Sequence, residues 1–63
     1  MLRRYMTLPA DVGARALFYG LSHVAIAKAA NVSLLTVQRV RGGQRGYCTT
    51  VRAIAQAIRA LLS

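Results

Sequence analysis

Residues 23–40 read HVAIAKAANVSLLTVQRV, and the next three residues are Arg-Gly-Gly. Apolar residues recur at helical spacing on either side of Asn31, Val32 and Ser33, which predicts a turn between two helices. Asn31 suits such a turn because Asn enters the left-handed backbone conformation more readily than most residues other than glycine. Ser33 is a favoured N-cap for the second helix, and the glycines after Arg41 are a favoured stop. The segment therefore predicts two short helices joined by a tight turn.

The flanking sequence predicts two more helices and shows no period-two alternation typical of strands. Pro9 and Asp11 suit the first turn of a helix that Gly20 ends, and Thr49 or Thr50 is expected to cap the last helix. The expected fold is an all-α, compact four-helix domain over residues 8–63, with helices at about 9–19, 23–30, 33–41 and 50–62, preceded by a flexible basic arm at 1–7. The predicted inward residues of the first helix are Ala10, Ala14, Leu17, Phe18 and Leu21. Those of the last helix are Val51, Ile54, Ala55, Ile58, Leu61 and Leu62.

The helix after the turn is expected to bury only part of its surface. Two helices joined by three residues cross at a steep angle, so a small residue, Ala27, is expected at the crossing. Val37 and Val40, three residues apart, face inward, and Leu34 and Leu35 are left on the remaining face. A helical hairpin that simply packs, with the two leucines in the core or in a dimer contact, is the alternative.

The charge balance points to a polyanionic partner. The chain of 63 residues has nine Lys and Arg residues against one acid, Asp11, and a net charge of +8. Eight of the nine are Arg, whose planar guanidinium suits phosphate and guanine. Because the basic side chains lack acidic partners, a nucleic acid is favoured over a merely solvated basic surface.

Composition also argues against other classes of protein. One Asp and one His do not make a paired-carboxylate or Ser/His/Asp catalytic site, so no enzymatic activity and no cofactor are expected. The single cysteine, Cys48, excludes an intrachain disulfide, favours a reducing cytoplasm, and together with one His leaves too few ligands for a zinc site. No run reaches the roughly 18 apolar residues of a membrane span, and residues 1–21 make a poor signal peptide.

Residues 20–43 resemble the helix-turn-helix of the phage repressor and Cro-like family, and the turn with its following helix is also similar to lactose-repressor-type headpieces. The residues that support the resemblance are Gly20-Leu21-Ser22, Ala27, Val32-Ser33, Val37, Arg39-Val40 and the glycine stop, followed by a helix with Ile54, Ala55 and Ile58 inward. The chain departs from the family in having Asn31 where glycine is usual, leucines at two usually polar positions, and His23 where Gln is frequent.

The resemblance implies that the helix after the turn reads bases in the major groove. The implied base-contacting residues are Leu34, Leu35, Gln38 and Arg39. The implied contacts to the DNA backbone are Ser22, His23, Ser33, Thr36, Arg41, Gln44, Arg45 and Tyr47. Arg39 is suited to bidentate pairing with guanine, and the leucines to thymine methyl groups. Arg3 and Arg4 are candidates for minor-groove contact, although a disordered terminus is the alternative.

The expected function is that of a small, sequence-specific transcriptional repressor of phage or plasmid type. It would bind a palindromic operator in double-stranded DNA as a homodimer, with the fourth helix as the expected interface, in the cytoplasm at the nucleoid. No small-molecule effector and no membrane are expected. The alternatives are a DNA-architectural or recombination-accessory protein and, from another class, a cationic membrane-active helical peptide.

Overall fold

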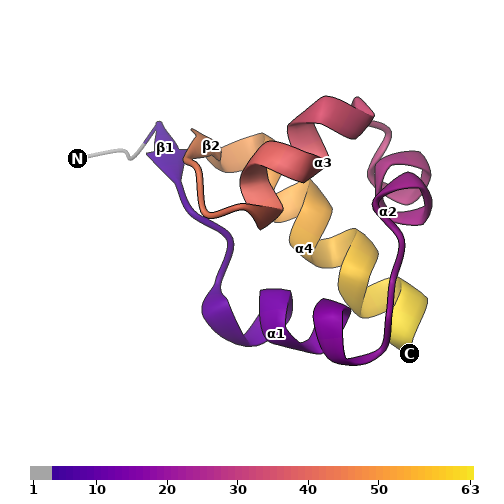
Figure 1. Cartoon of the computed structure of the whole chain (residues 1–63). Helices are drawn as coiled ribbons and strands as arrows, with labels where there is room; N and C mark the ends of the chain where they lie inside the picture. Colours follow the sequence, from indigo (N-terminus) through magenta and orange to yellow (C-terminus); the bar gives the residue numbers. More distant parts are fainter. Residues whose placement is uncertain (1–3) are drawn as a thin grey trace.

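The computed structural model describes residues 4–63, which form four helices and one two-stranded antiparallel sheet (Figure 1). The elements in chain order are β1 (Tyr5–Met6), α1 (Ala10–Phe18), α2 (His23–Ala30), α3 (Leu34–Arg41), β2 (Gly46–Tyr47) and α4 (Cys48–Leu62). The fold is thus mainly α, and the four predicted helices are confirmed with small shifts at their ends. The sheet was not predicted.

The long helix α4 forms the centre of the molecule, with α2 and the ribbon formed by β1 and β2 on one part of it and α1 on another, while α3 packs chiefly against α2 (Figure 1). Its buried residues are Val51, Ile54, Ala55, Ala57 and Ile58, while Leu61 remains largely exposed. The α2 helix contributes Ile26 and Ala27 and packs against both α3 and α4. Most of the apolar face of α4 is therefore used inside one chain, so the expected dimer interface on α4 retains little apolar surface.

The predicted inward stripe of α1 is wrong except for Leu21. The buried residues of this helix are Val12 and Ala16, whereas Leu17 and Phe18 are 75% and 82% exposed. Val12 and Ala16 are four residues apart and therefore lie on one face, and the half-buried Leu8 and Leu21 pack on the core at either end of the helix. A helix of nine residues offers more than one apolar stripe, and α1 buries the one with the smaller side chains.

The turn between α2 and α3 has the predicted geometry. Asn31 is left-handed, with φ of 57° and ψ of 46°, and is the one non-glycine residue of the described chain with positive φ. Ser33 Oγ accepts a hydrogen bond from Thr36 N at 3.2 Å, and Ser22 Oγ accepts one from Ala25 N at 3.1 Å. Both serines therefore cap the helices that follow them. Val32 packs against the core from within the turn.

The expected threonine cap of α4 is wrong, because the helix begins at Cys48 and its N-cap residue is Tyr47. The reason is the sheet: β2 pairs with β1 in the register Tyr5 to Tyr47 and Met6 to Gly46, which keeps the chain extended up to Tyr47. Cys48 N then donates to Arg4 O at 2.9 Å. Thr49 and Thr50 consequently lie inside the first turn of the helix.

Two residues of the arm expected at 1–7 form β1, so this part of the arm is fixed against the body of the protein. Arg3, a candidate for minor-groove contact, lies outside the described residues. Gly46 allows the ribbon formed by β1 and β2 to lie on the core, because a Cβ there would come within 3.2 Å of Cγ2 of both Val40 and Val51. The ribbon is thereby held beside α3.

Candidate functional site

The four residues predicted to contact bases all lie on the exposed surface of α3. Val37 and Val40, confirmed as inward, are 0% and 2% exposed and anchor the helix. At about 100° per residue, Leu35 and Arg39 project away from these two valines. Gln38 is also exposed and borders a hollow with residues of α1. Exposed Leu34 lies one turn before Gln38 on the same side of the helix. The two leucines are therefore surface residues of the single chain, not part of its core.

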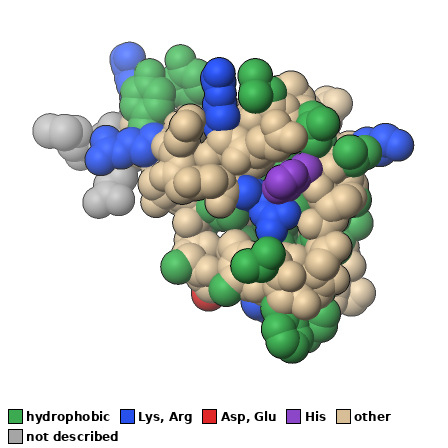
Figure 2. All heavy atoms as spheres, viewed as in Figure 1, with side chains coloured by type: hydrophobic (Ala, Val, Ile, Leu, Met, Phe, Trp, Pro, Cys, Tyr) green, Lys and Arg blue, Asp and Glu red, His purple; other side chains and the backbone are tan. Residues whose placement is uncertain are grey.

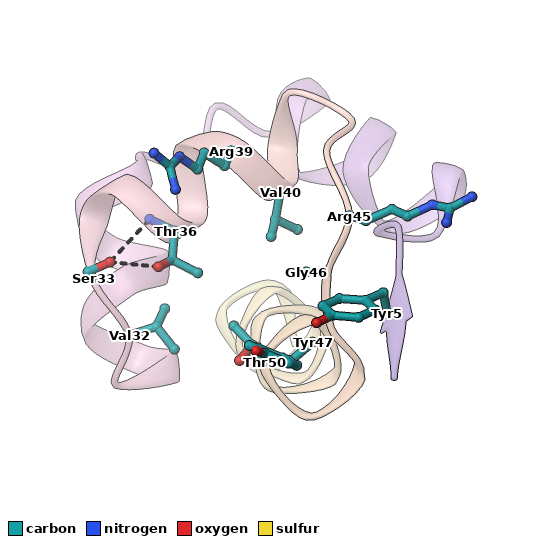
Figure 3. Close-up of a pocket in the computed structure, with 10 residues that line it drawn as sticks. All are labelled: Tyr5, Val32, Ser33, Thr36, Arg39, Val40, Arg45, Gly46, Tyr47 and Thr50. Carbon is teal, nitrogen blue, oxygen red and sulfur yellow. Dashed lines mark hydrogen bonds between the residues drawn. The ribbon is translucent and has the colours of Figure 1, made fainter. Parts of the chain in front are cut away.

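On the other flank of α3 lies a groove of about 470 Å³, bounded across from the helix by the ribbon and the start of α4 (Figure 3). Five of its ten lining residues have hydroxyl groups: Ser33 and Thr36 on the α3 side, and Tyr5, Tyr47 and Thr50 on the opposite side. The other lining residues are Val32, Arg39, Val40, Arg45 and Gly46. The groove thus has polar groups on two facing walls.

The two arginines at this groove lie at its margins. Figure 3 shows the guanidinium of Arg39 on the outer side of α3, and that of Arg45 directed away from α3 beyond the ribbon. Both side chains are exposed, and Arg45 also borders a second hollow with Tyr5, Met6 and Thr7. The positive charge therefore flanks the hydroxyl-lined groove on both sides.

Tyr5 and Tyr47 form a stacked pair on the ribbon, with ring centroids 5.0 Å apart and ring planes 29° apart. A side-chain hydrogen bond with Tyr47, followed by electrostatic repulsion between the two groups, raises the pKa of Tyr5 above its ordinary value. The phenol of Tyr5 is therefore protonated at neutral pH. Its ring is 49% exposed at the edge of the groove.

The residues predicted to contact the DNA backbone divide into two groups. Ser33, Thr36, Arg45 and Tyr47 line the groove described above. His23 and Arg41 border a separate hollow of about 400 Å³ between α1 and α3, together with Gln38. Ser22 and Gln44 border neither of these two hollows.

Arg41 also has a structural role, because its Nη1 donates to Leu21 O at 3.1 Å. This bond ties the end of α3 to the segment between α1 and α2. The half-buried Arg41 guanidinium therefore helps to hold the flank of the site, in addition to any contact with a ligand.

Sequence reasoning missed Tyr5 and Thr50 as members of the groove. Both reach it only because β1 pairs with β2 and because α4 begins early enough to place Thr50 in its first turn. A two-residue strand has no readable period, and its partner lies far along the chain, so the sequence offers no local pattern that predicts either placement.

The electrostatic character of the α3 side is basic. Asp11, the only acidic residue of the chain, lies in the first turn of α1, and Figure 2 shows it at the edge of the molecule remote from α3. Basic side chains also occur elsewhere: Arg52 and Arg59 of α4 border a hollow with Met6 and Pro9. The charge is therefore spread over the surface, and α3 differs from α4 in carrying two exposed leucines, Leu34 and Leu35, beside its arginines.

Within residues 4–63, no helix is both long enough and apolar enough to span a bilayer, and no three His, Cys, Asp or Glu side chains are placed to hold a metal ion. Comparison of the chain with protein families, curated proteins and solved structures finds no match.

Proposed function

We propose that this chain is a sequence-specific double-stranded DNA-binding protein in which α2, the turn and α3 act as a helix-turn-helix. The observation that supports this most strongly is the division of α3 between two faces. Val37 and Val40 are buried, while Leu34, Leu35, Gln38 and Arg39 are exposed on a helix at the surface of a strongly basic chain. A helix held in this way fits the major groove, where side chains read base edges.

The chemistry of that face suggests a division of tasks among its residues. Arg39 would donate two hydrogen bonds to O6 and N7 of guanine, and Gln38 would pair with adenine. Leu34 and Leu35 would contact thymine methyl groups. Ser33 and Arg45 line the groove beside the helix. The backbone of a bound duplex would run there, and contacts with these two residues would fix its register.

Selection of bound sequences from a random pool of duplexes provides the first test, and a palindromic consensus is expected. Arg39→Ala should then weaken binding to the selected duplex by about 1–3 kcal/mol, which is roughly 5- to 150-fold, and relax the preference at one base pair. Arg59→Ala is the matched control, because it removes the same charge from α4 next to Met6 and Pro9. Equal losses for the two variants on selected and scrambled duplexes would contradict base reading by α3.

As a finer proposal, the chain acts as a repressor that binds its operator as a homodimer and blocks RNA polymerase by occlusion. The second copy is expected to dock on the exposed apolar residues Leu17, Phe18 and Tyr19, because this uncharged cluster avoids contact between two strongly basic surfaces. Figure 2 shows apolar side chains gathered at this end of α1.

Sedimentation on an operator-length duplex measures how many chains bind each duplex. At protein concentrations where the unsubstituted chain binds as two, Phe18→Ser should bind as one chain per duplex. One chain per duplex for both proteins would contradict the dimer. Strong DNA bending without repression of a promoter would indicate an architectural role instead.

A further inference from the structure

We infer that the groove between α3 and the ribbon binds the phosphodiester backbone of the DNA strand that runs alongside α3, with hydroxyl groups of Tyr5 and Thr50 as donors to phosphate oxygens. The inference rests on the proposed function and extends it to two residues on β1 and α4 that no resemblance assigned. Its basis is the facing arrangement of hydroxyl groups in the groove (Figure 3).

The position of the groove favours the backbone over the bases. The major groove of B-DNA is about 12 Å wide, and an α-helix with its side chains is about 10–12 Å across. A helix in the major groove therefore fills it, and whatever lies on the flank of that helix meets a sugar-phosphate strand. The groove lies on such a flank, with Thr36 of α3 on one wall and Tyr5 and Thr50 on the other.

The hydrogen-bond donors of the groove suit an acceptor-only ligand. Ser33 Oγ and Thr36 Oγ1 are 2.7 Å apart and share one hydrogen, so the pair retains one O–H group that is not used between them. The phenols of Tyr5 and Tyr47 also share one hydrogen bond, so this pair too retains one O–H group, which Tyr5 offers when Tyr47 is the donor between them. Phosphate oxygens accept hydrogen bonds and do not donate them, and no acidic residue lines this groove.

Neutral hydrogen-bond donors differ from arginine in how they affect the salt dependence of DNA binding. A guanidinium that neutralises a phosphate releases counterions and adds about 0.9 to the slope of log K against log salt. A hydroxyl group adds a hydrogen bond without displacing an ion. Loss of the groove hydroxyls should therefore lower affinity for every duplex while the salt slope and the preferred sequence stay unchanged.

The test uses the full chain with Tyr5→Phe, Thr50→Val and the double variant, titrated against selected and scrambled duplexes at several salt concentrations. Tyr5→Phe removes one oxygen and retains the ring that stacks on Tyr47. We expect a loss of roughly 2- to 10-fold for each hydroxyl, at constant salt slope. Thr49→Val is the matched control, because exposed Thr49 neighbours Thr50 in the same helical turn but does not line the groove. It should bind as the unsubstituted chain does.

Phosphate ethylation gives a direct readout. In the unsubstituted chain, ethylation of one or two phosphates beside the bases read by α3 should block binding, and the double variant should lose that sensitivity. The inference is wrong if both single variants bind the duplexes as tightly as the unsubstituted chain does, or if they lose affinity only for single-stranded oligonucleotides. In either case Arg39→Ala still tests base reading by α3. If the unsubstituted chain binds no duplex, the proposed function and this inference both fail.

Discussion

Gly46→Ala is expected to destabilise the protein because it forces the ribbon away from the core. A Cβ at this position would lie 3.2 Å from Cγ2 of Val40 and 3.2 Å from Cγ2 of Val51. Both valines are buried, and a β-branched side chain in a helix has little choice of rotamer, so neither is free to move aside. The ribbon must therefore shift instead.

The size of the effect follows from two opposing contributions. Overpacking a close-packed core by one methyl group costs about 1–3 kcal/mol. Replacing glycine also restricts the unfolded chain, which returns about 0.4–1 kcal/mol where the backbone conformation is compatible. Gly46 does not have positive φ, so this smaller stabilising contribution applies. The net expectation is a loss of about 1–2 kcal/mol of unfolding free energy.

Gly13→Ala provides the matched comparison, because the same methyl group is added where there is space. Its Cβ would meet Leu8 Cδ2 at 3.5 Å, an ordinary contact, and Gly13 lies inside α1, where alanine is favoured by about 0.5–1 kcal/mol.

Thermal unfolding followed by circular dichroism measures both variants, with a shift of roughly 4–8 °C per kcal/mol for a domain of this size. Gly46→Ala should melt lower and Gly13→Ala higher than the unsubstituted chain. A Gly46→Ala variant as stable as the unsubstituted chain would show that the ribbon is not seated on these valines.

Further predictions concern the turn, the caps and the salt dependence. Asn31→Gly should be neutral or stabilising by up to ~1 kcal/mol. Asn31→Val should destabilise by about 1–2 kcal/mol, because a β-branched residue is strained in the left-handed region. Thermal melts in which the Val variant is more stable than the Gly variant would contradict this. Ser22→Ala and Ser33→Ala should each cost about 1 kcal/mol in denaturant titrations through loss of a helix cap. Arg45→Ala should weaken all duplexes alike and reduce the slope of log K against log salt by about 0.9, and an unchanged slope would exclude a phosphate contact.

The centre of the fold was predictable because its determinants are local. Asn31 and Ser33 specify the turn through their own backbone and side-chain preferences, and Val37 and Val40 are recognisable by their spacing within one short helix. The face buried by α1 was not predictable in the same way. Leu17 and Phe18 are larger and more apolar than Ala16, but the face that docks is decided by the space beside α4, which is a property of the assembled fold.

The candidate site shows the same division. The exposed face of α3 follows from the spacing within α3 itself, so the sequence predicts Leu35 and Arg39 together on one surface. The opposite wall of the groove depends on Tyr5 and Thr50, which are brought there by pairing between distant segments. Helical periodicity contains no information about such pairing, and a strand of two residues is too short to show its own.

The pairing of β1 with β2 has a kinetic consequence. The contacts of α2 with α3 join neighbouring parts of the chain, whereas the ribbon pairs Tyr5 with Tyr47 and so closes a long loop that includes α1, α2 and α3. Because the entropy lost on closure rises with loop length, the ribbon is expected to form after the contacts of α2 with α3 on folding and to open before them under native conditions. Amide exchange at Met6 and Cys48 should then be much faster than at Ile54, with Tyr5 and Tyr47 alternating between a stacked, closed ribbon and a brief open state.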